Sequence, residues 1–291
     1  MFISKINRNL MQFRGRLFRY NIHVDNNFDS LDLILKNQSL SVVRFGDGEF
    51  DIINGKSIPY QIYDKDLAKR MKKIILNGSN SKLLVCLPDI FKKVGRYNKD
   101  CKNFYYGNFF YQNRKILKEI EKKNRVYGST FISRPYIDLK DKRRSKVYFK
   151  KLRQVWENKD ILIIEGKYSR SGEGNNLFSN ANSVSRIICP SKNAFFSLKK
   201  IEESIKIHAT NKLILLMLGP TAKIIIDDLH CQLNNQMIDL GHVDSEYEWF
   251  LMGAKSKIKI SHKHTAEFNY DDNKVKLMAN DSFNEQVVDQ I

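Results

Sequence analysis

The chain has 291 residues and a formal net charge of +18, with 42% hydrophobic and 11% aromatic residues. This length can bury a full core, and this composition is typical of a globular protein rather than a disordered one. No run of about eighteen uncharged apolar residues occurs, so no transmembrane helix is expected, and the N-terminus lacks the features of a secretory signal. Four widely spaced cysteines without metal or redox spacing are expected to be free thiols in a reducing cytoplasm.

The first predicted element is a basic amphipathic helix within residues 1–20, which we place in a separate N-terminal segment of residues 1–25. Five cations occur there without an acid, namely Lys5, Arg8, Arg14, Arg16 and Arg19. Six apolar residues recur at helical spacing, namely Phe2, Ile3, Ile6, Leu10, Phe13 and Leu17. This pattern is typical of a helix lying on an anionic bilayer. A helix packed on the body of the protein gives the same pattern, so both interpretations stay open.

Short apolar runs then alternate with amphipathic helical patterns. Strands are predicted near residues 40–43, 83–87, 126–127, 160–164, 187–189, 213–218 and 237–240. Helices are predicted over 64–77, 113–123, 145–157, 194–206 and 221–233, and from about 246. Asp64 is the expected N-cap of the first of these helices, and Gly78 follows its end.

Unbroken apolar strands between helices indicate a parallel sheet with helices on both faces. The predicted fold class is therefore α/β, with a single Rossmann-like domain over residues 26–262 and a mostly parallel sheet. The basic N-terminal helical extension precedes this domain. A polar C-terminal tail over residues 263–291 follows it, and we expect the tail to fray after residue 265.

Two acidic residues, Asp47 and Glu49, follow the first buried strand. They are predicted to lie on a loop beside Gly46 and Gly48, because glycine lets the backbone turn sharply. Two carboxylates one residue apart on such a loop can share Mg²⁺ or Mn²⁺, which take their remaining ligands from water and substrate phosphates. The alternative interpretation is an acidic turn in solvent.

Glycine, charged and amide residues also follow three later strands, in segments 165–176, 219–221 and 241–246. Because ligands bind at the carboxyl ends of parallel strands, these segments predict a binding site. Thr221 is expected to open a helix whose backbone N–H groups suit a phosphate, although simple capping also explains it. His242 and Asp244 are two positions apart and are predicted to lie on the same face of an extended segment. There they could ligate a metal, or one of them could act as a general base. The alternative is that Asp244 caps the next helix.

Other signals are weaker. Gly172-x-Gly174 lacks the spacing of a dinucleotide site, and the sequence has no phosphate-binding P-loop or nucleophile elbow. The basic cluster at 140–146 is interpreted as a solvated loop, a phosphate patch or a second membrane contact. His262 and His264 have ligand-like spacing, but a solvated strand edge is the favoured interpretation.

Six motifs occur in a fixed order: Arg44-Phe-Gly-Asp-Gly-Glu49, Phe131-Ile-Ser-Arg-Pro-Tyr136, Glu165 with Ser169-Arg170, Cys189-Pro-Ser-Lys-Asn193, Gly219-Pro-Thr221, and the segment 238–250 around His242. This set resembles the bacterial glycosyltransferases of the GT-D fold, a Rossmann-like class that carries an Asp-x-Glu motif. The resemblance covers roughly residues 30–260.

The resemblance implies a metal-dependent hexosyltransferase that moves a sugar from a nucleotide-sugar, with a UDP-sugar as the expected donor. The acceptor would be a bacterial surface glycan or a glycoprotein glycan. Asp47 and Glu49 would bind Mn²⁺ or Mg²⁺, which neutralises the leaving diphosphate, and His242 and Asp244 would complete the catalytic set. The implied substrate-binding residues are Arg44, Gly46, Arg134, Glu165, Arg170, Gly172, Asn175, Ser191, Asn193, Gly219, Pro220 and Thr221.

The binding partners considered are a lipid-linked acceptor and an anionic membrane surface. Binding to nucleic acid is not expected. The expected location is the cytoplasm, with peripheral attachment to the inner face of the cytoplasmic membrane as an option. Two rival classes stay open. One is a metal-dependent phospho- or nucleotidyltransferase that uses the same Asp-x-Glu site, and the other is a nucleic-acid-binding protein that uses the basic charge.

Overall fold

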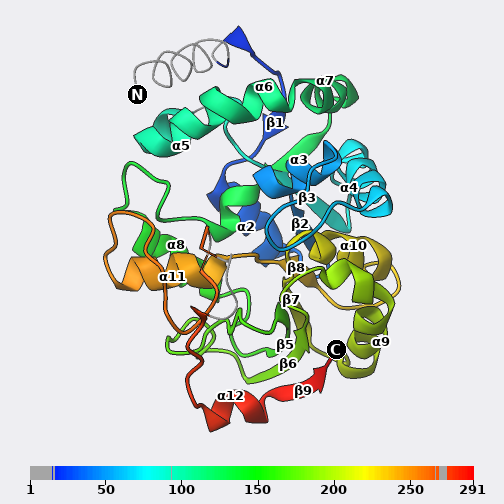
Figure 1. Ribbon diagram of the computed structural model, residues 1–291, viewed down its shortest axis with the longest axis vertical. Coiled ribbons are helices and arrows are strands. Elements are labelled where there is room, and N and C mark those ends of the chain that lie inside the picture. The colour runs from blue at the N-terminus through cyan, green and yellow to red at the C-terminus, as the bar shows by residue number, and fades with distance from the viewer. Residues whose placement is uncertain (1–14, 16, 93, 266, 269–273) are drawn as a thin grey trace.

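The computed structural model describes residues 15, 17–92, 94–265, 267–268 and 274–291 (Figure 1). Within these residues, nine strands form one sheet in the order β1-β4-β3-β2-β8-β7-β5-β6-β9, and every neighbouring pair is parallel. The strands are β1 (His23–Val24), β2 (Ser41–Arg44), β3 (Leu83–Leu87), β4 (Val126–Ser129), β5 (Asp160–Gly166), β6 (Ser183–Cys189), β7 (Leu213–Met217), β8 (Met237–Asp239) and β9 (Val287–Gln290). The expectation of a mostly parallel α/β sheet is confirmed.

Helices cover both faces of this sheet (Figure 1). The α-helices are α2 (Asn27–Lys36), α3 (Asp47–Ile53), α4 (Lys65–Asn77), α5 (Lys99–Phe104), α6 (Phe110–Gln112), α7 (Arg114–Lys123), α8 (Ser145–Arg153), α9 (Leu198–His208), α10 (Gly219–Leu229), α11 (Val243–Leu251) and α12 (Asp281–Glu285). Short 3₁₀ turns occupy η1 (Val94–Arg96), η3 (Thr130–Ser133) and η4 (Ala194–Ser197), and η2 (Tyr105–Phe109) is a π-helical turn.

Two hydrophobic cores form because successive side chains of a strand point to opposite faces. In β2, Val43 packs into the core shared with α3, α4, α7, α9 and α10, whereas Val42 packs into the core shared with α2, α8 and α11. Ile164 and Ile163 of β5 divide between the same two cores. The continuous apolar runs of these strands are therefore explained by burial on both faces.

All seven predicted strands are present, and the predicted caps of α4 are confirmed. The Asp64 carboxylate accepts the backbone N–H of Leu67 at 2.9 Å, and Gly78 has a φ of 69°. The sequence patterns did not predict α2, α3, α5, α6, α12, β1 and β9. The expectation that the tail frays is wrong for β9, which pairs with β6 at Arg186↔Val287. The last long helix, α11, begins at Val243 rather than near Glu246.

The predicted N-terminal helix falls largely on residues 1–14 and 16, which lie outside the described residues. In the described part of the chain, no helix combines the length and apolar character needed to cross a bilayer. The prediction of free thiols is confirmed, since Cys86, Cys101 and Cys189 are buried and unpaired and Cys231 is exposed and unpaired.

Candidate active site

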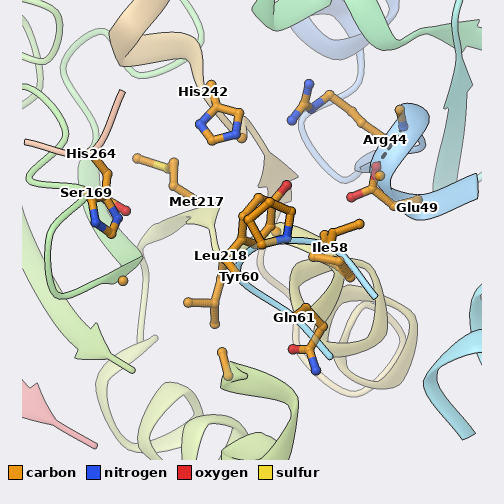
Figure 2. Close-up of a pocket in the computed structure, with 18 of the residues that line it drawn as sticks. Arg44, Glu49, Ile58, Tyr60, Gln61, Ser169, Met217, Leu218, His242 and His264 are labelled. Atoms are coloured by element: carbon orange, nitrogen blue, oxygen red, sulfur yellow. Dashed lines mark hydrogen bonds between the residues drawn. The ribbon is translucent and has the colours of Figure 1, made fainter. Parts of the chain in front are cut away.

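A pocket of about 310 Å³ opens at the carboxyl-terminal edge of the sheet. Every predicted strand-end segment contributes to its lining, for example through Asp47 after β2, Ser169 after β5, Gly219 after β7 and His242 after β8. Figure 2 shows Arg44 and Glu49 on one side of this pocket and Ser169 and His264 on the other. The strand-end rule therefore located the pocket from sequence.

Asp47 and Glu49 lie in the first turn of α3, so the prediction that they occupy a loop is wrong. Gly46 is the N-cap in an extended conformation with a φ of −102°, and its backbone N–H donates to Glu49 Oε2 at 2.8 Å. Glu49 thereby satisfies one donor at the start of the helix. Residues two apart on a helix point in different directions, so the two carboxylates have different surroundings.

Glu49 is held by a buried lysine. Lys223 of α10 is only 2% exposed, and its Nζ lies 2.8 Å from Glu49 Oε1 and 2.9 Å from Asp239 Oδ2. Asp239 is fully buried at the end of β8 and also pairs with Arg44 at 3.2 Å. Burial alone would raise the pKa of Asp239, but Arg44 and Lys223 hold that pKa below its usual value.

Asp47, in contrast, has no ion pair with any described residue and is exposed to the pocket. Its pKa is raised, chiefly because the pocket walls desolvate it and also because Glu49 repels it, while Arg134 opposes the rise. Asp47 is therefore the carboxylate of the pair that is available to a cation.

Arg134 lines the pocket among three carboxylates. It lies 2.9 Å from Asp138, 3.1 Å from Glu267 and 3.9 Å from Glu246, and these acids raise its pKa in spite of burial. Glu246 is 1% exposed and accepts two backbone N–H groups, those of residues 136 and 137, at 3.0 Å each. Burial raises the pKa of Glu246 to about 7.

His242 and Tyr60 also line the pocket, and both are labelled in Figure 2. Their rings meet edge to face with centroids 6.4 Å apart. Burial lowers the pKa of His242 to about 4, so its imidazole is neutral at physiological pH. The Tyr60 ring covers Gly219, where a Cβ would lie 2.8 Å from Tyr60 Cε2. Glycine is required there, since its φ is 52° as well.

Asp244 lines the pocket, but all its observed bonds go to the protein. Its Oδ1 accepts from the Gly172 backbone N–H and the Asn175 amide, each at 2.8 Å. Its Oδ2 pairs with Lys263 Nζ at 2.8 Å, and Lys263 is 1% exposed. These contacts fasten the turn at 172–175 to the start of α11, which is a structural task. A catalytic role for Asp244 stays a prediction.

The other residues expected from the resemblance divide into two groups. Arg44, Gly46, Arg134, Ser191, Gly219 and Pro220 line the pocket. Glu165, Arg170, Gly172, Asn175, Asn193 and Thr221 lie outside its lining as the structure describes it.

Members of the second group shape the walls or support them. Glu165 accepts the Ser171 backbone N–H at 2.7 Å and pairs with Arg186, while Arg170 pairs with Glu173. The side chain of Asn193 accepts the backbone N–H of Ile62 at 2.8 Å. This bond holds the turn that carries Tyr60. Thr221 is fully buried inside α10, which begins at Gly219, so its predicted capping role is wrong.

The pocket residues missed from sequence include Tyr60, Lys223 and Glu267. Lys223 had a usable signal, because it interrupts the apolar run from Ala222 to Ile226 on a helix predicted to cover the sheet. A lysine in such a run is buried only if it has partners. Tyr60 and Glu267 lie in irregular segments, where periodicity gives no signal.

Besides the short helix α3, the longer helices α10 and α11 begin at the pocket, and their N-termini would favour an anion there. Residues from the first turns of α10 and α11, including Gly219 and Ser245, line the pocket. As the structure describes them, neither helix has a side-chain hydrogen bond at its N-cap. Free backbone N–H groups and the positive ends of helix dipoles make such termini anion-binding sites.

The residues present fit a divalent cation only in part. Among the described residues, no group of three or more His, Cys, Asp or Glu side chains is arranged to hold a metal. A Mg²⁺ or Mn²⁺ ion that also binds substrate phosphates needs only one or two carboxylates. Asp47 fits that requirement, whereas each oxygen of Glu49 already accepts one hydrogen bond.

The fold is Rossmann-like with a pocket at the strand ends, and comparison with known families gives its class. The model of the glycosyltransferase GT-D fold family matches residues 42–268. The chain belongs to this glycosyltransferase family, and the resemblance noted in the sequence is confirmed.

Named relatives come from streptococci. The probable glycosyl transferase Gly of Streptococcus gordonii is 49% identical over 259 residues, which cover 89% of this chain and 37% of that protein. The glycosyltransferase GlyD of Streptococcus pneumoniae is 47% identical over 269 residues, which cover 90% of this chain and 32% of that protein. The chain thus spans about a third of the length of these curated relatives.

A solved structure supports the same assignment. A glycosyltransferase from Streptococcus sanguinis is 48% identical with a TM-score of 0.89, over 93% of this chain and 100% of that chain.

Proposed function

We propose that this glycosyltransferase moves a sugar from a UDP-sugar to a glycan acceptor with the help of Mn²⁺ or Mg²⁺. The acceptor is a bacterial surface glycan or a glycoprotein glycan. One observation carries the proposal: two helix N-termini and the carboxylate of Asp47, which has no ion pair within the described part of the chain, line the same pocket. Helix N-termini suit a diphosphate, and a single free carboxylate suits a metal that also binds that diphosphate.

Asp47 would hold the metal together with donor phosphates and water, and Glu49 would contribute its remaining lone pairs. The bound metal would neutralise the charge that develops on the leaving diphosphate. Arg134 lines the pocket and is assigned to the phosphates; its guanidinium would exchange its contact to Glu267, which also lines the pocket, for a bidentate contact to them. The guanidinium of Arg44 is committed to Asp239, Thr130 and Ser133, so we assign it to holding the floor of the site.

His242 serves the sugar rather than the diphosphate in this proposal. Its neutral imidazole adds no charge, but it can accept or donate a hydrogen bond to a sugar hydroxyl. The aromatic ring of Tyr60 lies beside the His242 imidazole. Asp244 is assigned to the wall of the site, for the reasons given by its contacts.

The nucleotide product tests the proposed reaction. The full chain is incubated with a panel of nucleotide-sugars and Mn²⁺, with and without monosaccharide acceptors, and the released nucleotide is identified by chromatography. Release of UDP from a UDP-sugar supports the proposal. Release of pyrophosphate from a nucleoside triphosphate, or phosphorylation of an acceptor, would instead support the rival nucleotidyl- or phosphotransferase class.

We also propose that the enzyme works in the cytoplasm, with residues 1–20 attaching it to the inner face of the membrane near a lipid-linked acceptor. Each basic residue near an anionic surface contributes about 1 kcal/mol, and the apolar stripe adds to this. Co-sedimentation with anionic liposomes should therefore be salt-sensitive and should fall when Arg8, Arg14, Arg16 and Arg19 are replaced by serine. Equal sedimentation of the variant and the intact chain would contradict this attachment.

A further inference from the structure

Four charges of alternating sign form a buried row along one wall of the pocket: Arg44, Asp239, Lys223 and Glu49. Two of them, Arg44 and Glu49, are visible on the same side of the pocket in Figure 2. The row connects the end of β8 with the first turn of α3 through Lys223 of α10. Its four formal charges cancel.

Lys223 has no spare donor in this row. An ammonium group carries three N–H donors. The three acceptors around Nζ are Glu49 Oε1 at 2.8 Å, Asp239 Oδ2 at 2.9 Å and the carbonyl oxygen of Gly219 at 3.0 Å. Lys223 can therefore reach a substrate phosphate only by breaking one of these bonds, and its influence on the reaction must pass through its partners.

Of the two acidic partners of Lys223, Glu49 lines the pocket and Asp239 does not. Lys223 and the Gly46 backbone N–H each take one lone pair of the Glu49 carboxylate, which fixes its orientation and leaves two lone pairs free. A divalent cation at those lone pairs would lie close to the Lys223 charge and be repelled by it. Asp47 has no ion pair with a described residue, and the cation that acts on it, Arg134, is itself paired with Asp138 and Glu267.

We propose that Lys223 is a positioning residue that acts through Glu49, fixing its carboxylate and weakening its hold on a divalent cation. This inference rests on the proposed metal-dependent function. Asp47 then contributes one uncompensated negative charge beside the balanced row, so the empty site binds metal weakly. The donor diphosphate would supply the further negative charge that firm metal binding needs.

Calorimetric titration of the full chain with Mn²⁺ alone tests this role. Two charges about 5 Å apart near a protein surface interact strongly, so Lys223→Met should tighten the Mn²⁺ dissociation constant by at least about tenfold. Lys223→Arg keeps the charge and should leave the constant within about threefold of the wild-type value. In a Glu49→Gln background, Lys223→Met should have a clearly smaller effect, because the carboxylate through which Lys223 acts is gone.

Unchanged or weaker Mn²⁺ binding in Lys223→Met would overturn the inference, as would equal tightening in the Glu49→Gln background. If Lys223→Met does not fold, Lys223→Gln keeps donors for Asp239 without the charge, and the same tightening is expected. Asp47→Asn separates the two proposals. If Asp47→Asn loses Mn²⁺ binding while Lys223→Met leaves it unchanged, this inference is refuted and the proposed metal function is not. Absence of wild-type Mn²⁺ binding both without UDP and with UDP refutes the proposed metal function too.

Discussion

Replacing Asp244 by asparagine decides whether this residue is structural or catalytic. Asp244 accepts hydrogen bonds from Gly172 and Asn175 and pairs with the buried Lys263. In Asp244→Asn, one amide oxygen keeps the first two bonds, while the amide N–H₂ faces the Lys263 ammonium. The lysine keeps only its contacts to the Glu173 carbonyl at 2.7 Å and to a single carboxylate, that of Glu248, at 3.3 Å.

Breaking one partner of a buried ion pair costs about 3–5 kcal/mol, because a charge is left in the interior without its partner. The surviving bonds of Lys263 place the cost for Asp244→Asn near the lower end, at about 3 kcal/mol. Urea unfolding of the two proteins measures this difference in the free energy of unfolding. The double variant Asp244→Asn/Lys263→Met should recover part of the loss, since removing both partners is less costly than removing one.

The opposite pattern would refute the reasoning. If Asp244→Asn unfolds within about 0.5 kcal/mol of the wild type, the ion pair has no structural importance. If turnover then falls by orders of magnitude in this stable variant, Asp244 is a catalytic group, as its place in the 238–250 motif suggested.

Two further predictions concern stability. Gly241 has a φ of 47°, and a Cβ there would lie 1.8 Å from Arg44 Nη2, so Gly241→Ala should destabilise the protein by at least about 3 kcal/mol. Gly55→Ala is the matched control in thermal unfolding, because Gly55 also has a positive φ, 85°, but has open space around it. This control should lose only about 1 kcal/mol of unfolding free energy. Equal losses in the two variants would contradict the predicted clash with Arg44. Glu246 should make stability depend on pH, since burial raises its pKa from 4.5 to about 7. Between these values the folded state holds one more proton than the unfolded chain, so the free energy of unfolding should fall by roughly 3 kcal/mol as pH rises through this window and then level off. Glu246→Gln should remove that decrease in urea unfolding at several pH values, and an unchanged pH profile would contradict the assignment.

The sheet was predictable because its signal is local. A strand such as Ile161–Ile164 is apolar at every position since both of its faces are covered, and that pattern is visible without knowledge of its neighbours. The position of the pocket followed from the same strands by the strand-end rule. The strand β9 was missed because Val287–Gln290 is short and partly polar, and it is defined by its pairing with β6.

The chemistry of the site was less predictable because it depends on long-range partners. Asp47 and Glu49 look equivalent in the sequence, but α3 turns one toward open space and the other toward Lys223, which lies 174 positions further along the chain. Arg170 belongs to a motif with charged neighbours, yet its side chain pairs with Glu173 beside Phe283, away from the pocket. Spacing along the chain cannot show which charges neutralise one another.

UDP release by Asp47→Asn, compared with the wild type in the presence of Mn²⁺ and in excess chelator, tests the central claim most directly. Asp66→Asn is the matched control, since Asp66 is an exposed acid in the first turn of α4, outside the described pocket lining. We predict that the wild type and Asp66→Asn release UDP from a UDP-sugar only with metal, and that Asp47→Asn loses at least about a hundredfold in rate. Full activity of Asp47→Asn, or an undiminished wild-type rate in excess chelator, would contradict the account.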